Sequence, residues 1–131
     1  MPERARILVV DDEEKIRDIV AHLLGKAGYE VRKAAGGEEG IAAAEEFRPH
    51  AILLDVMMPG MDGFAACRVL RQKKGLATVP VIFLTAKKGP RNWLEAKDSG
   101  AVAYLEKPFQ KDILLALVSE VLKNPPAQTP A

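Results

Sequence analysis

Four short, continuous apolar runs stand out along the chain. They occupy residues 7–10, 51–54, 81–84 and 102–105. Each run is too short for a helix in a domain of this size, and unbroken rather than alternating hydrophobicity is typical of strands that are covered on both faces. A fifth and more polar candidate strand, residues 30–34, suits the edge of a sheet.

The segments between these runs carry helical patterns. One stripe follows the i, i+3, i+4, i+7 spacing of a buried helix face and ends before Gly28: Ile16, Ile19, Val20, Leu23, Leu24 and Ala27. Three further helices are marked by Ile41, Ala44 and Phe47, by Phe64, Cys67 and Leu70, and by Ile113, Leu114, Leu117, Val121 and Leu122. Residues 90–99 have only a thin apolar face, but parallel strands need a crossover, so we expect a helix there too. Five strand–helix units in alternation predict an open α/β sandwich.

Composition narrows the class of protein. The chain has 131 residues, 48% of them hydrophobic, which predicts one domain with a substantial core. A formal net charge of +1 gives no indication of binding to nucleic acid or to an anionic membrane. The single cysteine excludes an intrachain disulfide, and no apolar run approaches the ~20 residues of a membrane span. We therefore expect a cytoplasmic protein without membrane insertion, with its domain at residues 1–123 and a Pro-rich disordered tail or linker stump at 124–131.

Polar residues follow directly after the apolar runs. Asp11 and Asp12 come after the first run, Asp55 after the second, Thr85 after the third, and Lys107 lies two residues beyond the fourth. The carboxyl ends of strands in an open parallel sheet lie at one edge, and ligands bind in the crevice there. The fold itself would therefore bring these side chains into one pocket.

This set of residues suits the chemistry of a phosphoryl group. Carboxylates that lie close together repel one another unless a cation lies among them, and oxygen ligands at a partly open site suit Mg²⁺. One carboxylate can then attack phosphorus and form an acyl phosphate. Lys107 is placed to neutralise the phosphoryl oxygens, and Thr85 to donate its hydroxyl to one of them.

Each residue taken alone also has an ordinary structural interpretation. Asp11 or Asp12 alone is more often a helix cap, and Asp55 alone could be a turn residue. Thr85 alone is more often a residue at a strand end than a ligand, and Lys107 alone is more often solvated. Their occurrence at successive strand ends favours one shared site.

These motifs resemble the receiver domain of two-component response regulators. The acidic residues at 11–14, the loop at 55–63, Thr85-Ala86 and Lys107-Pro108-Phe109 all match, and together they cover residues 5 to 123. The resemblance implies a flavodoxin-like doubly wound sandwich of five helices and a five-stranded parallel sheet in the order 2-1-3-4-5.

The resemblance also implies a role for each site residue. Asp55 would be the phospho-acceptor and Lys107 the partner of the phosphoryl group. Mg²⁺ (or Mn²⁺) would be held by Asp12 and Asp55, by Asp11 directly or through water, and by the backbone carbonyl of Met57. The protein would be a regulatory phospho-acceptor, with at most self-catalysed phosphorylation and dephosphorylation.

Activation and partners follow from the same resemblance. Thr85 would move inward on phosphorylation and Tyr104 would fill the vacated space, which alters the surface around the fourth helix, the last strand and the last helix. The bond between Lys107 and Pro108 would be cis. The implied partners are a sensor histidine kinase or histidine phosphotransfer protein and a downstream effector, with the chain a monomer or a phosphorylation-dependent dimer.

Three positions depart from the common receiver pattern. Residues 100–104 lack the acidic pair that many receivers have before the tyrosine, and Leu117 stands where winged-helix regulators often have arginine. Both departures argue against that subfamily's dimer and against direct contact with nucleic acid. Lys87 is unusual in sign for the rim of the site, so it would either alter the aspartyl-phosphate lifetime or simply be a solvated loop lysine.

Three other hypotheses remain open at this point. A haloacid-dehalogenase-type phosphatase would need a second aspartate two residues after Asp55, where this chain has Met57. A flavin or nucleotide carrier would need a Gly-, Ser- or Thr-rich phosphate cradle after the first strand, where this chain has four acidic residues, 11–14. The third is a degenerate receiver that binds partners without phosphorylation.

Overall fold

Five strands and five helices alternate along the chain. The computed structural model describes residues 4–86 and 90–123. The elements are β1 (Arg6–Val10), α1 (Glu14–Lys26), β2 (Glu30–Ala34), α2 (Gly37–Phe47), β3 (Ala51–Asp55), α3 (Gly63–Arg71), β4 (Val81–Thr85), α4 (Pro90–Asp98), β5 (Ala103–Glu106) and α5 (Lys111–Lys123). All ten elements were predicted, and most strand boundaries differ from the apolar runs by one residue.

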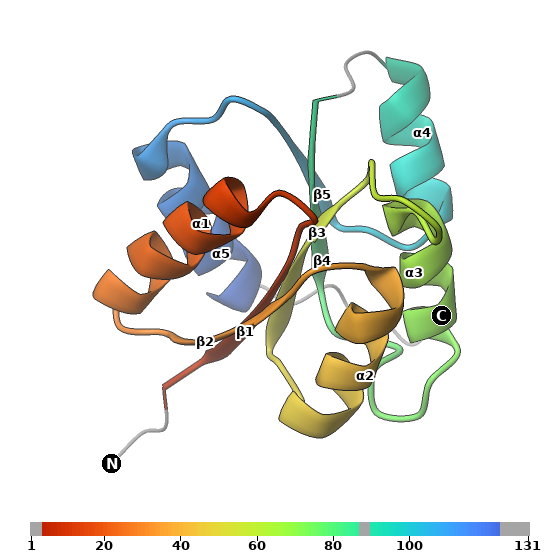
Figure 1. Ribbon diagram of the computed structural model, residues 1–131, viewed down its shortest axis with the longest axis horizontal. Helices are drawn as coiled ribbons and strands as arrows, with labels where there is room; N and C mark the ends of the chain where they lie inside the picture. Colours follow the sequence, from red (N-terminus) through yellow and green to blue (C-terminus); the bar gives the residue numbers. More distant parts are fainter. Residues whose placement is uncertain (1–3, 87–89, 124–131) are drawn as a thin grey trace.

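The strands form one parallel sheet in the order β2-β1-β3-β4-β5 (Figure 1). The predicted order is therefore confirmed, as is the edge position of the polar strand β2. The central strand β3 is buried along its whole length, which explains its unbroken apolar sequence. Within the described ranges, no helix combines the length and the apolar character that crossing a membrane requires.

Two apolar layers cover the two faces of the sheet. Alternate strand residues such as Ile7, Leu53 and Ile82 pack against α1 and α5, whereas Leu8, Ile52 and Phe83 pack against α2, α3 and α4. Figure 1 shows this division, with α1 and α5 on one side of the sheet and the other three helices on the opposite side. Because both faces are covered, the open positions in this fold lie at the ends of the strands.

Some of the predicted core positions are wrong. In α1, Val20 and Leu24 are fully buried but Ile19 is 55% exposed, and Ala27, which follows the last residue of the helix, is exposed as well. In α5, Ile113 is 50% exposed although its neighbour Leu114 is buried. The apolar stripe on each helix is wider than the strip of sheet that the helix covers, so residues at the margin of the stripe face solvent.

The C-terminal end of α4 is held by α3. The guanidinium of Arg71 donates to the carbonyl oxygen of Gly100 from Nε (3.1 Å) and Nη2 (2.7 Å), and to that of Leu76 from Nη1 (3.2 Å). Ala96 and Ser99 are buried beside it. These bonds tie the turn after α4 to α3, and α4 itself lies beside β5.

The loop between β3 and α3 requires close approach of two backbone segments. The N–H of Gly63 donates to the carbonyl oxygen of Val56 at 2.9 Å, and the Asp62 carboxylate caps α3 by accepting from the N–H of Ala65 at 2.9 Å. A Cβ at position 63 would overlap with the carbonyl oxygen of Asp55 and lie 2.8 Å from Cα of Val56. Glycine is therefore required there to bring α3 against the end of β3.

We expect Gly63→Ala to lower the free energy of unfolding by about 2–3 kcal/mol, because the clash is with backbone that cannot turn aside. Gly25→Ala is the matched control: Gly25 lies in α1 with nothing within 4 Å of an added Cβ, so this change should raise stability by about 0.5–1 kcal/mol. Urea denaturation followed by circular dichroism measures both changes. A Gly63→Ala protein as stable as the wild type would contradict the packing of this loop.

Candidate functional site

The residues predicted to form a site come together at the carboxyl edge of the sheet. Val10 pairs with Leu54 across β1 and β3, so Asp11 and Asp55 follow at the same level. Asp55 pairs in turn with Leu84, the residue before Thr85. The backbone N–H of Lys107 donates to the carbonyl oxygen of Thr85 at 2.8 Å. The strand register therefore brings four separate segments to one place.

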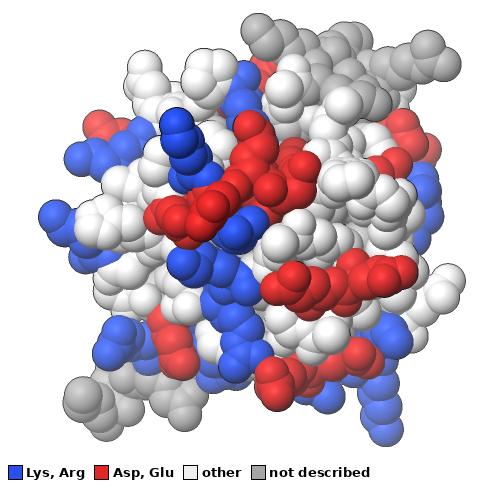
Figure 2. Space-filling view, in the orientation of Figure 1, with Lys and Arg blue, Asp and Glu red and all other residues white. Residues whose placement is uncertain are grey.

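Three aspartates form a compact cluster. Asp11 and Asp55 are buried, with 0% and 2% of their surface exposed, and Asp12 is exposed beside them. Each of the three offers a carboxylate oxygen, and these oxygens all lie within 4.8 Å of one another. Figure 2 shows acidic side chains crowded over the start of α1, with basic side chains adjoining them.

Backbone donors fix the two buried carboxylates. The N–H of Glu13 donates to Asp11 Oδ1 at 2.9 Å, and the N–H of Met57 approaches Asp55 Oδ1 at 3.4 Å. Nη1 of Arg17 donates to the carbonyl oxygen of Asp11 at 2.8 Å, which ties the end of β1 to α1. Asp11 thus stabilises the turn into α1, but its other carboxylate oxygen faces the cluster.

Lys107 is the cation of this cluster. Its Nζ lies 2.9 Å from Asp11 Oδ2, 3.2 Å from Glu13 Oε1 and 3.5 Å from Asp55 Oδ2. The side chain of Lys107 is only 11% exposed. The bond from Lys107 to Pro108 is cis, as the resemblance implied.

Burial and the nearby charge of Asp11 raise the pKa of Asp55. Desolvation, followed by the negative charge of Asp11, raises the pKa of Asp55 from 3.8 to about 7, although Lys107 and the N–H of Met57 act in the opposite direction. Burial alone would lower the pKa of Lys107, but its hydrogen bond to Asp11 and the charges of Asp55 and Asp11 raise it. The ammonium is therefore charged, while the metal-free cluster still carries excess negative charge.

The donor set fits a hard divalent cation. Carboxylate oxygens in a partly exposed cluster are the ligands that Mg²⁺ takes, and such an ion would relieve the repulsion that raises the pKa of Asp55. Asp12 is exposed, so the cluster is open to solvent on one side. That opening leaves room for water and for a phosphate oxygen among the ligands.

The two positions predicted to act in switching lie on neighbouring strands. Thr85 is fully buried at the end of β4. Tyr104 in β5 pairs with Phe83 of β4 and is half-buried against the core on the side of α2, α3 and α4. Burial raises the pKa of the Tyr104 hydroxyl, with a further contribution from Glu106. Lys87 lies outside the described residues.

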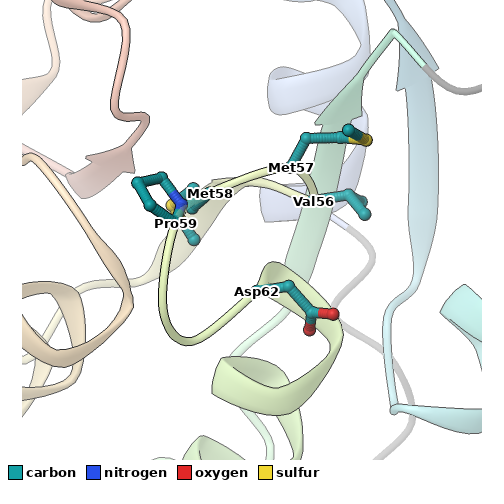
Figure 3. Close-up of a pocket in the computed structure, with 5 residues that line it drawn as sticks. All are labelled: Val56, Met57, Met58, Pro59 and Asp62. Carbon is teal, nitrogen blue, oxygen red and sulfur yellow. The ribbon is translucent and has the colours of Figure 1, made fainter.

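The loop after Asp55 lines a pocket of about 400 Å³ beside the aspartate cluster. Val56, Met57, Met58, Pro59 and Asp62 form its described walls (Figure 3). The side chains of Met57 and Met58 leave the loop on different sides, with 54% and 7% of their surface exposed. The exposed thioether of Met57 cannot transfer protons, which removes the second acid that the phosphatase hypothesis requires.

One residue at this site was not predicted. Glu13 contacts Lys107 through its side chain, although the sequence indicates only that it belongs to an acidic run. Glu13 also stands at the N-cap position of α1, but its side chain makes no capping hydrogen bond. Its carboxylate is directed to Lys107 instead of to the helix.

Comparison with known proteins assigns this arrangement to a family. The family model of the response regulator receiver domain matches residues 7–119, which is most of the chain. The chain belongs to the response regulator receiver family. The resemblance drawn from the four motifs is confirmed, and membership of this family argues against the flavin or nucleotide carrier hypothesis.

Similar proteins include transcriptional regulators and chemotaxis proteins. This receiver is 42% identical over 119 residues to the DNA-binding dual master transcriptional regulator RpaA of Synechocystis sp., covering 91% of this chain and 49% of RpaA. It is 38% identical over 126 residues to the alkaline phosphatase synthesis transcriptional regulatory protein PhoP of Bacillus subtilis, covering 96% and 52%. The structure of Vibrio cholerae chemotaxis protein CheY4 matches with a TM-score of 0.88 and 39% identity, covering 91% of this receiver and 99% of CheY4.

The receiver spans about half the length of the curated relatives it matches. RpaA is named as a DNA-binding protein, and this name conflicts with the expectation that the present chain makes no direct contact with nucleic acid. Leu117, which stands in place of the arginine of winged-helix regulators, packs against the apolar layer of α1 and α5.

The raised pKa of Asp55 predicts a pH-dependent stability. The folded state holds the Asp55 proton more tightly than the unfolded state does, so ionisation destabilises the fold progressively from about pH 4 up to about pH 7 and by a constant amount above that. In Mg²⁺-free buffer at pH 8, Asp55→Asn should therefore raise the free energy of unfolding by about 2 kcal/mol. The difference should narrow as the pH falls towards 5.

Urea denaturation at pH 5, 6.5 and 8 in the presence of a chelator measures this difference. Asp62→Asn is the control, since it removes a carboxylate outside the cluster and leaves a side chain that still caps α3. It should change stability far less than Asp55→Asn at pH 8. An Asp55→Asn protein that is no more stable than the wild type at pH 8 would show that ionised Asp55 does not destabilise the fold.

Proposed function

We propose that this receiver accepts a phosphoryl group on Asp55 from the phosphohistidine of a sensor histidine kinase or a histidine phosphotransfer protein. The observation that carries the proposal is the buried Asp55 carboxylate 3.5 Å from the Lys107 ammonium and beside two further aspartates. Membership of the receiver family supports the same role. The function is regulatory, and any catalysis is limited to the chain's own phosphorylation and dephosphorylation.

The divalent cation of the proposed site is Mg²⁺ or Mn²⁺. Asp12 and Asp55 would hold it through their carboxylates, with Asp11 as a ligand directly or through water and the backbone carbonyl of Met57 as a further ligand. When bound, the cation supplies positive charge that neutralises the carboxylates and the incoming phosphoryl oxygens. The residues of the chain supply the nucleophile, its orientation and a second positive charge.

The transfer itself needs one nucleophile and one leaving group. A carboxylate oxygen of Asp55 forms a bond to phosphorus while the bond from phosphorus to the histidine nitrogen breaks, and the electron pair of that bond stays on the imidazole. The backbone N–H of Met57 approaches the other oxygen, Oδ1, and orients the carboxylate. Lys107 is close enough to pair with a phosphoryl oxygen after a small movement of its side chain.

The proposed output runs through Thr85 and Tyr104. A phosphoryl group on Asp55 would offer an acceptor to the hydroxyl of Thr85, which ends the neighbouring strand β4. Tyr104 is half-buried on the edge strand β5 beside α4, so it can turn inward when Thr85 moves. The surface of α4, β5 and α5 then changes, and Leu94 of α4, with 60% of its surface exposed, offers an apolar contact to an effector.

Incubation with acetyl phosphate and Mg²⁺ followed by intact-protein mass spectrometry tests the proposal. We expect the wild type to gain one phosphoryl group, and Asp55→Asn and chelator-treated wild type to gain none, because each lacks the nucleophile or the cation. Asp62→Asn, which leaves the cluster intact, should be labelled like the wild type. Equal labelling of Asp55→Asn would mean that another residue is the acceptor.

A further inference from the structure

We propose that Glu13 is a positioning residue that holds the Lys107 ammonium on the Asp11 side of the cluster until a phosphoryl group arrives at Asp55. The inference rests on the proposed roles of Asp55 and Lys107 and adds a residue to them. Glu13 would make the resting receiver slower to accept phosphate than its other site residues allow.

The Lys107 ammonium lies closer to Asp11 and Glu13 than to Asp55. Its Nζ donates hydrogen bonds to Asp11 at 2.9 Å and to Glu13 at 3.2 Å, whereas Asp55 lies at 3.5 Å as an ion-pair partner. An ammonium has three donors, and two of them are directed to residues that follow β1. In this resting arrangement Lys107 is therefore turned partly away from the carboxylate that it is expected to serve.

The two carboxylates that accept hydrogen bonds from Lys107 differ in solvent exposure. Asp11 is fully buried, is fixed by the N–H of Glu13, and belongs to the aspartate cluster that would share a cation. The side chain of Glu13 is 62% exposed and is not a member of that cluster. A cation bound at the cluster would weaken the attraction between Asp11 and Lys107. Glu13 is then the other carboxylate among the described hydrogen-bond partners that can hold Lys107 away from a phosphoryl group on Asp55.

The release of Lys107 by Glu13 costs little. An exposed carboxylate can turn into water with only a small loss of Coulomb energy, so the contact is weak enough to yield to a doubly charged phosphoryl group. It is still strong enough to bias the position of Lys107 before that group is present. Because the Glu13 side chain makes no capping bond with α1, its loss should leave the helix in place.

Three variants separate contact from charge. Glu13→Gln removes the charge, and Glu13→Asp keeps the charge but is one methylene too short to hold Nζ at its present position. Glu14→Gln removes a neighbouring exposed charge at the first residue of α1. With acetyl phosphate at saturating Mg²⁺, we expect the phosphorylation rate to rise about two- to fivefold in both Glu13 variants and to stay within about 1.5-fold of the wild type in Glu14→Gln.

A second readout needs neither metal nor phosphate. In the metal-free protein, the side-chain ammonium of Lys107 should give a distinct, slowly exchanging ¹⁵N signal, assigned by its loss in Lys107→Gln. We expect this signal to broaden or shift in both variants, because Glu13→Gln replaces the charged acceptor of the ammonium by a neutral one and Glu13→Asp withdraws the acceptor from it. Glu14→Gln should leave it unchanged.

The outcomes separate the role of Glu13 from the proposed function. Wild-type phosphorylation with an unchanged or slower rate in Glu13→Gln would overturn the role of Glu13 alone. A Glu13→Asp rate equal to that of the wild type would show that charge repulsion, rather than contact, is responsible, and would also overturn it. A wild-type chain that takes up no phosphoryl group would overturn both proposals.

Discussion

The structure depends on the enforced proximity of Asp11 and Asp55. Strand pairing places the two carboxylates side by side and buries them almost completely, and among the described residues the Lys107 ammonium is their ion-pair partner. Burial, followed by the negative charge of Asp11, raises the pKa of Asp55 to about 7, although the Lys107 ammonium acts in the opposite direction. A divalent cation bound at these carboxylates would relieve their repulsion, so the proposed metal site and the stability of the fold depend on the same residues.

The same strands connect this site with a distant surface. Thr85 ends β4, and Lys107 follows directly after β5, the strand that contains Tyr104. Helix α4 lies beside β5 and is tied at its C-terminal end by the bonds of Arg71 to Gly100. A movement of Lys107 towards a phosphoryl group would therefore act on the strand that lies beside α4, through contacts that are already in place.

Much of the fold could be predicted because its sheet is covered on both faces, so that the inner strands β1, β3 and β4 contain unbroken apolar runs. Strand ends were missed by one residue where pairing continues into a polar side chain, as at Asp55 and Thr85. Ile19 and Ile113 were wrongly assigned to the core because helical periodicity gives the direction of a stripe but not the width that neighbouring elements cover. Strand-end polarity predicted the gathering of the aspartates with Lys107. It could not show which acid pairs with Lys107, and the contact with Glu13, 94 residues away, follows only from the folded geometry.

The location of the cation tests this description most directly. Crystals of the receiver soaked in Mn²⁺ and measured at a wavelength where manganese scatters anomalously would reveal the ion without assumptions about the chemistry. The arrangement of the strand ends predicts one strong peak within coordinating distance of the carboxylate oxygens of Asp12 and Asp55, next to Asp11. A well-ordered site with no peak there, or a peak only at another acidic surface such as the start of α2, would contradict it.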